Sequence, residues 1–162
     1  MSADKKNKVR ILHLEDDPVD AELVSATLES EGLSCDIVHV DNKDEFITTF
    51  SSGHFDVILS DFSLPQFDGL TALRIVRELN TEIPFILLSG MLGEEVATDS
   101  IKAGATDYVL KQRITRLAPS VKRALREAEE RLQRRRAEDA LNESEEKYRN
   151  LVDNLDIGVT LI

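Results

Sequence analysis

The sequence predicts an α/β domain with a doubly wound, five-stranded parallel sheet, followed by a long C-terminal helical extension. Short apolar segments alternate with stretches of helical spacing from Val9 to Leu117, and this alternation is typical of a parallel sheet with helices on both faces. From Ser120 to Ile157 the chain contains no proline or glycine, which favours one continuous helix.

Five short segments rich in β-branched and aliphatic residues are the expected strands. In chain order they are Val9–Leu14, Cys35–Val40, Val57–Ser60, Phe85–Ser89 and Tyr108–Leu110. Between them, apolar residues recur three to five positions apart, as on one face of a helix. These residues are Ala21, Val24 and Leu28, then Phe46 and Phe50, then Leu70, Leu73 and Val76, then Val96 and Ile101. Pro18 stands at an expected helix start, and Gly32 and Gly104 stand at expected helix ends.

The composition indicates a globular protein in a reducing compartment. The chain is 41% hydrophobic, and its single cysteine, Cys35, has no partner for an internal disulfide. No apolar run approaches the roughly 20 residues that span a bilayer, and the N-terminus is too poor in apolar residues for a signal peptide. We therefore expect a cytoplasmic protein that does not bind membranes.

The net charge of -11 is unevenly distributed along the chain. Residues 1–115 carry 21 acidic and 10 basic side chains, whereas residues 116–162 carry 10 of each. This shift indicates a boundary between two regions. Because the acidic region offers no basic stripe for phosphate backbones, we expect no nucleic-acid binding.

Polar side chains follow the predicted strands at the edge where open α/β sheets bind ligands. Asp16 and Asp17 follow the first strand, Asp61 ends the third, Ser89 ends the fourth and Lys111 follows the fifth. Three carboxylates at one place repel one another unless a cation balances them, and oxygen ligands suit Mg²⁺ or Mn²⁺. Asp17 before Pro18 could instead be only a helix N-cap.

This set of groups suits phosphoryl transfer. An aspartate carboxylate can accept a phosphoryl group and form an acyl phosphate. A lysine ammonium and a serine hydroxyl can then bind the other phosphoryl oxygens, which are the roles that Lys111 and Ser89 fit.

At this point the sequence resembles the receiver domains of response regulators, over Lys8 to about Arg126. The motifs occur in the family's order and spacing. They are Asp16-Asp17, Asp61 with Leu64-Pro65 and Asp68-Gly69 after it, Ser89-Gly90, Lys102-Ala103-Gly104-Ala105, Asp107-Tyr108 and Lys111. The resemblance implies a flavodoxin-like receiver fold and, as phosphoryl donor, a histidine kinase or a phosphotransfer protein.

The resemblance also implies the roles of individual residues. Asp61 would be the phosphoacceptor, with a metal held by Asp17, Asp61 and the backbone carbonyl of Ser63 and oriented by Asp16. The remaining implied roles concern the switch: Ser89 moves toward the phosphoryl group, Tyr108 changes rotamer with it, and Lys111 binds the phosphate.

Two positions that vary within the family lack a group that could orient an attacking water. These are Ser63, two residues after Asp61, and Met91, two residues after Ser89. We expect slow hydrolysis of the acyl phosphate. Ser63 also argues against an aspartyl phosphatase, because that class expects a second carboxylate at this position.

The C-terminal helical region has apolar residues at coiled-coil spacing. The phase slips near Arg134–Arg136. We expect a homodimer through this helix, with a solvated single helix as the alternative. The seam residues are Val121, Leu125, Ala128 and Leu132, then Ala137, Leu141, Ser144, Tyr148, Leu151 and Leu155.

The last stretch, Ser144–Ile162, resembles the opening of a PAS sensory domain, with a strand expected at Gly158-Val159. The predicted organisation is a receiver domain at 1–126, a helical coiled-coil linker at 127–150 and the start of a PAS-like domain at 151–162. This pattern favours a piece of a longer signalling protein.

The leading hypothesis is a phosphoacceptor receiver domain of a two-component phosphorelay that regulates an attached sensory or output module. The alternative is a receiver-like interaction or dimerisation scaffold that is not phosphorylated. We expect no enzymatic activity beyond self-phosphorylation and self-dephosphorylation, although the parent protein could be a hybrid sensor histidine kinase.

His13 and His39 lie in predicted strands, where we expect them to be packed or hydrogen-bonded.

Overall fold

The computed structural model describes residues 8–79, 82–90 and 93–160 and divides into two units, Met1–Arg126 and Glu127–Ile162. The first unit contains a five-stranded parallel sheet with the order β2-β1-β3-β4-β5, which confirms the predicted fold class. The strands are β1 (Val9–Leu14), β2 (Cys35–Val40), β3 (Val57–Asp61), β4 (Phe85–Ser89) and β5 (Asp107–Leu110).

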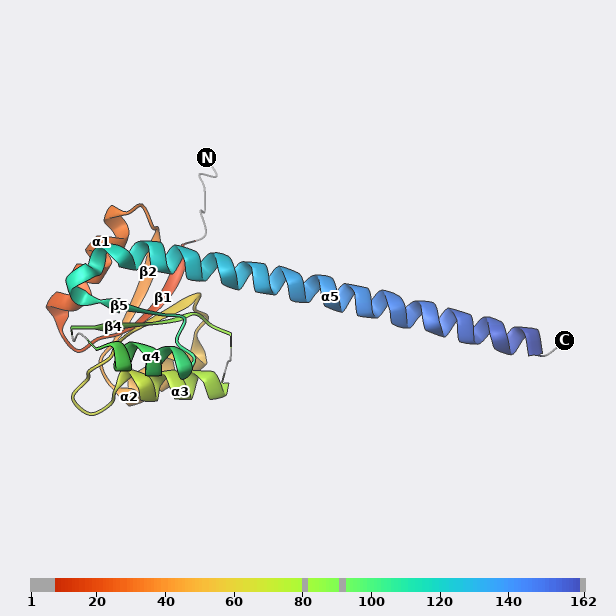
Figure 1. The fold of residues 1–162 in the computed structure, drawn as a ribbon, viewed down its shortest axis with the longest axis horizontal. Helices are drawn as coiled ribbons and strands as arrows, with labels where there is room; N and C mark the ends of the chain where they lie inside the picture. The colour runs from red at the N-terminus through yellow and green to blue at the C-terminus, as the bar shows by residue number, and fades with distance from the viewer. Residues whose placement is uncertain (1–7, 80–81, 91–92, 161–162) are drawn as a thin grey trace. The chain divides into compact units, whose positions relative to one another are not determined.

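Helices cover both faces of this sheet (Figure 1). Helix α1 and the beginning of α5 lie on one face, and α2, α3 and α4 lie on the other. Their bounds are α1 (Pro18–Ser30), α2 (Lys43–Ser52), α3 (Gly69–Leu79), α4 (Glu94–Lys102), the 3-10 helix η1 (Lys111–Arg116) and α5 (Leu117–Thr160).

The two layers of helices bury two apolar clusters against the sheet. Every residue of β3 and β4 is buried, as expected for central strands that are covered on both faces. One cluster includes Phe46 of α2 and Leu73 of α3, and the other includes Leu28 of α1 and Val121 of α5. This rigid core holds the carboxyl ends of the strands in place.

The first turns of α5 belong to the core of this domain. Leu117 and Val121 are fully buried, and Leu125 packs against the same apolar cluster. The sequence placed Val121 and Leu125 in a coiled-coil seam, and this placement is wrong. A core-facing helix and a coiled coil share nearly the same apolar spacing, so the pattern alone does not distinguish them.

In the second unit α5 continues to Thr160, and the side chains of residues 131–155 are exposed. The strand expected at Gly158-Val159 is wrong, because both residues lie within α5. A strand needs a neighbour for its backbone hydrogen bonds, whereas a helix makes them internally. Residues 161–162 of the expected PAS-like segment lie outside the described residues. Among the described helices, none is both long and apolar enough to span a bilayer.

Candidate functional site

Two acidic side chains meet where β1 and β3 end. These parallel strands are paired with Leu14 opposite Ser60, so Glu15 and Asp61 are the next residues along each strand. Glu15 is 4% exposed and Asp61 is 7% exposed. Their carboxylates therefore lie at the edge of the sheet where open α/β folds bind ligands.

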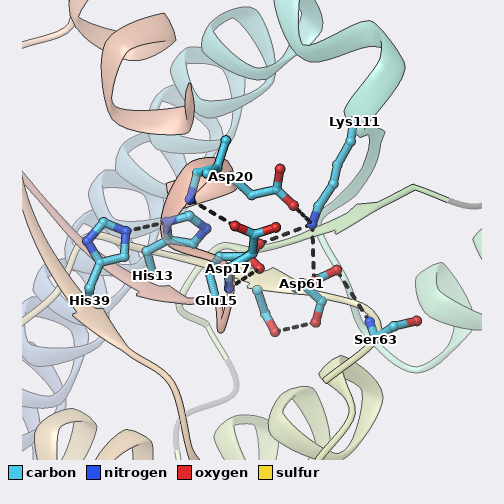
Figure 2. A network of polar contacts seen from close by, with 10 residues as sticks. His13, Glu15, Asp17, Asp20, His39, Asp61, Ser63 and Lys111 are labelled. Carbon is cyan, nitrogen blue, oxygen red and sulfur yellow. Dashed lines mark hydrogen bonds and ion pairs between the residues drawn. The ribbon is translucent and has the colours of Figure 1, made fainter. Parts of the chain in front are cut away.

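Lys111, the first residue of η1, brings a positive charge to these carboxylates (Figure 2). Its Nζ donates to Asp20 Oδ2 at 2.7 Å, to Glu15 Oε2 at 3.1 Å and to Asp61 Oδ2 at 3.1 Å. Burial alone would lower the pKa of Lys111, but hydrogen bonds to Asp20 and Asp61 and the charges of Asp61 and Glu15 raise it. The ammonium therefore stays protonated at neutral pH.

The side chain of Glu15 is fully buried. Its Oε1 accepts a hydrogen bond from the backbone N–H of Asp17 at 3.1 Å. Burial is the main cause that raises the pKa of Glu15 to about 7, with a contribution from the charge of Asp61; the Asp17 N–H and Lys111 act in the opposite direction. Lys111 brings one positive charge to the three carboxylates of Glu15, Asp20 and Asp61, so it does not fully balance the negative charge of this site.

Glu15, Asp16 and Asp61 form an acidic cluster in which one oxygen of each carboxylate lies within 4.8 Å of the others. Asp16 is exposed, whereas the other two are buried, so the cluster is accessible from solvent. Carboxylate oxygens at this spacing suit a hard divalent cation such as Mg²⁺ or Mn²⁺, and such a cation would balance the remaining charge. The cluster therefore fits the metal expected from the sequence.

Asp17 does not join this cluster. Its Oδ1 accepts a hydrogen bond from the backbone N–H of Val19 at 2.8 Å, and it is the N-cap of α1. The N-cap is the alternative that the sequence left open, and the acid that clusters with Asp16 and Asp61 is Glu15. The reason is local, because the first residue after β1 faces the sheet edge while Asp17 has already entered the turn into α1.

The loop after β3 lies close to Asp61. The backbone N–H of Ser63 is 3.4 Å from Asp61 Oδ1, so the predicted metal-binding carbonyl of Ser63 belongs to the same short loop. A Cβ at Gly69 would lie 2.5 Å from the Asp61 carbonyl oxygen. Glycine is therefore required for α3 to begin this close to β3.

The two predicted switch residues come from the neighbouring strands. Ser89 ends β4, is 1% exposed and pairs with Leu110 of β5, so it reaches the same edge as Asp61. Tyr108 of β5 is half-buried and packs against the cluster that contains Phe46. Met91, which the sequence singled out for its effect on hydrolysis, lies outside the described residues.

Comparison with known proteins identifies the family. Residues 11–122 match the response regulator receiver domain. The chain belongs to this family. The receiver domain is similar to YcbL of Bacillus subtilis, an uncharacterised transcriptional regulatory protein, with 34% identity over 71% of this chain and 50% of that protein. The chain spans about half the length or less of the curated relatives it matches.

Solved receiver domains show the same fold. The receiver domain of a signal transduction histidine kinase from Syntrophus aciditrophicus has a TM-score of 0.62 and 34% identity, covering 72% of this chain and 89% of that chain. The BeF3-activated receiver domain of DrrB, a protein of Thermotoga maritima, has a TM-score of 0.64 and 27% identity, covering 73% of this chain and 97% of that chain.

Two side chains of the receiver site were not predicted, Glu15 and Asp20. Glu15 directly follows the apolar run of β1, and this position could have identified it. Because Asp16 and Asp17 are also acidic, the sequence does not show which of the three acids faces the sheet edge. The signal for Asp20 was its place three residues after Asp17 at the start of a helix, one turn from the same sheet edge.

The receiver domain also contains a histidine pair beside the acidic site. His13 of β1 and His39 of β2 are partners in the sheet, and His13 Nδ1 lies 2.9 Å from His39 Nε2. This contact confirms the expectation that the two strand histidines are hydrogen-bonded. His13 is fully buried, and burial, followed by the charges of His39 and Lys111, lowers the pKa of His13 to about 3.

Proposed function

We propose that Asp61 of this receiver domain accepts a phosphoryl group from a histidine kinase or a phosphotransfer protein. The observation that supports it most is the contact of the Lys111 ammonium with the carboxylates of Asp61 and Glu15, inside a cluster that fits a divalent cation. In the transfer, a carboxylate oxygen of Asp61 attacks the phosphorus of a phosphohistidine. The new O–P bond forms as the N–P bond breaks, and the imidazole of the donor leaves with the electron pair.

In this proposal each residue of the site has a separate task. Glu15, Asp16, Asp61 and the backbone carbonyl of Ser63 would hold Mg²⁺ or Mn²⁺. The cation would supply positive charge that offsets the charge of the phosphoryl oxygens. Lys111 would bind one phosphoryl oxygen, and the Ser89 hydroxyl would bind another.

We further propose that the phosphorylated domain regulates an attached module through α5. The observation in favour is the set of hydrogen bonds made by Asp107, which directly precedes Tyr108 on β5. Asp107 Oδ1 accepts a hydrogen bond from the backbone N–H of Tyr108 at 2.8 Å. Asp107 Oδ2 accepts hydrogen bonds from two side chains of α5, Ser120 Oγ at 2.5 Å and Arg123 Nη2 at 2.8 Å. One carboxylate thus joins the backbone of the switch residue to the beginning of α5. The C-terminal module would be a PAS-like domain.

The exposed half of α5 favours a parallel dimeric coiled coil. Beyond the domain core, Leu141, Tyr148, Leu151 and Leu155 are each at least 58% exposed and recur at seven-, three- and four-residue spacing, as in a coiled-coil seam. A long helix gains most of its stability from burying such a face. The partner in this proposal is a second copy of the chain.

Phosphorylation is tested by treating the protein with a small acyl phosphate and measuring the added mass. We expect labelling of the wild-type protein with Mg²⁺ or Mn²⁺, none of Asp61→Asn, and undiminished labelling of Asp99→Asn, a matched change at an exposed aspartate on α4. Equal labelling of wild type and Asp61→Asn, or labelling that persists with a chelator, would contradict the assignment. No labelling at all would favour the alternative, a scaffold that is not phosphorylated.

A further inference from the structure

Asp20 contacts the site from outside the acidic cluster. It lies in the first turn of α1, and its Oδ2 is 2.7 Å from Lys111 Nζ. This is the shortest of the three contacts of the ammonium. Figure 2 shows the Asp20 and Asp61 carboxylates approaching Lys111 from different sides. The contact ties α1 to the residue that follows β5.

The number of protons on Lys111 indicates what this contact does. An ammonium has three N–H donors, and here they serve three carboxylates, those of Glu15, Asp20 and Asp61. If a phosphoryl group is attached to Asp61, one of its oxygens can take the donor that Asp61 now uses. The hydrogen bond between Lys111 and Asp20 does not need to break in that case.

We propose that Asp20 is a positioning residue that holds the Lys111 ammonium in place for a phosphoryl group on Asp61. The proposal rests on the proposed function of Asp61 as phosphoacceptor. A lysine side chain has four rotatable carbon–carbon bonds and loses substantial rotamer freedom when it is fixed. If a contact already fixes the lysine side chain, less conformational entropy is lost when a phosphoryl group binds to it.

The opposite role, in which Asp20 withholds Lys111 from the phosphoryl group, fits the structure less well. Lys111 already reaches Asp61 while it contacts Asp20, so neither contact must break for the other to form. An effect of Asp20 on the helix dipole alone is a second alternative, since acidic residues in a first turn stabilise helices. That effect would not depend on Lys111.

The experiment compares Asp20→Asn, Asp20→Glu and a control, Glu22→Gln, which removes one charge from the same helix. The probe is beryllofluoride with saturating Mg²⁺, a phosphoryl mimic whose affinity is measured by calorimetry. We expect Asp20→Asn to weaken beryllofluoride binding by roughly five- to tenfold, the order of one partly lost charge-assisted hydrogen bond. We expect Asp20→Glu to recover part of the loss and Glu22→Gln to bind as the wild type does.

A second readout tests positioning without any phosphoryl group. In protein with ¹³C-labelled lysine, a fixed Lys111 side chain gives two separate ε-proton signals, which should merge in Asp20→Asn and stay separate in Glu22→Gln. Unchanged or tighter beryllofluoride binding by Asp20→Asn, or ε-proton signals that stay separate in this variant, would overturn the proposal. Absence of beryllofluoride binding by the wild type would instead refute the proposed function of Asp61.

Discussion

The ammonium of Lys111 lies 3.1 Å from the carboxylate of Asp61, although 50 positions separate them in the sequence. Lys111 is also paired with Glu15 and Asp20, so one cation is shared by three carboxylates. The side chains of Lys111 and Asp61 are only 21% and 9% exposed. Water therefore screens these charges weakly, and the balance between them should be measurable in the stability of the fold.

Replacement of Lys111 by methionine should destabilise the metal-free protein. The variant leaves three acidic groups without their cation, and breaking such a largely buried pair costs about 2 kcal/mol or more. Urea unfolding in the presence of a chelator measures the loss. Because Mg²⁺ would supply the missing charge, it should stabilise Lys111→Met more than it stabilises the wild type.

The control for this prediction is Lys102→Met, at an exposed lysine in the last turn of α4. It should change neither the stability without metal nor the effect of Mg²⁺. If Lys111→Met unfolds at the wild-type urea concentration in chelator, the three carboxylates do not depend on Lys111.

The acyl phosphate on Asp61 should hydrolyse slowly compared with those of other receiver domains. The reason is that neither Ser63 nor Met91 has an amide or carboxylate side chain that could orient an attacking water. The backbone N–H of Ser63 lies 3.4 Å from Asp61 Oδ1 and the side chain of Ser63 is exposed, so an asparagine at this position is close to Asp61 and has room to orient a water. The double variant Ser63→Asn with Met91→Glu should therefore lose its phosphoryl group faster than the wild type. The decay of the phosphorylated mass after removal of the donor gives the rate, and a decay no faster than wild type would contradict the prediction.

The chain should dimerise through the part of α5 that follows Arg126. Light scattering should show a dimer for the intact chain and a monomer for a chain cut after Arg126, the last residue of the first unit. Replacing Leu141 and Leu151 together by serine should weaken the dimer. Val19→Ser, at a residue that is 72% exposed on α1, is the matched control and should have no effect.

A monomeric intact chain at tens of micromolar would refute the coiled coil. A cut chain that is equally dimeric would show that the faces of the receiver domain hold the pair.

The stability of the fold should fall below pH 6.5 partly because of His13. Its pKa is lowered to about 3 in the folded protein, whereas an unfolded histidine has a pKa near 6.5. Between these values the unfolded chain binds a proton that the folded chain does not. Stability is therefore unaffected by His13 above pH 6.5 and decreases as the pH falls, by up to about 1.4 kcal/mol per pH unit.

Urea unfolding of wild type and His13→Gln in chelator at pH 7.5, 6 and 5 checks this effect. Glu15, whose pKa is raised to about 7, is present in both proteins, so the difference between the two slopes reports on His13 and its contact with His39. The slope should be shallower in His13→Gln, and parallel slopes would contradict the prediction.

The sequence predicted the sheet closely because strand and loop differ sharply in composition. The apolar runs that became β1, β2 and β4 end where polar residues begin, and their predicted bounds agree with the structure. Asp61 and Ser89 could be placed at one edge for the same reason, since each is the last residue of a buried strand. The parallel topology then brings such residues together without further information.

The acidic partner of Asp61 could not be assigned in this way. Glu15, Asp16 and Asp17 are consecutive acids, and which of them faces the sheet depends on where the backbone turns from β1 into α1. A shift of one residue exchanges a buried carboxylate beside Asp61 for an exposed helix N-cap. The beginning of α5 poses the same problem, because Val121 has the spacing of a coiled-coil residue and is fully buried in the domain core.

The position of Tyr108 has an optical consequence. The chain has no tryptophan and only two tyrosines, and the second, Tyr148, is 71% exposed on α5. In Tyr148→Phe the half-buried ring of Tyr108 is the sole source of intrinsic fluorescence above that of phenylalanine. The emission of this variant therefore reports on one side chain of β5, the strand whose Leu110 pairs with Ser89, and the protein can be titrated with metal or phosphoryl donor without an added dye.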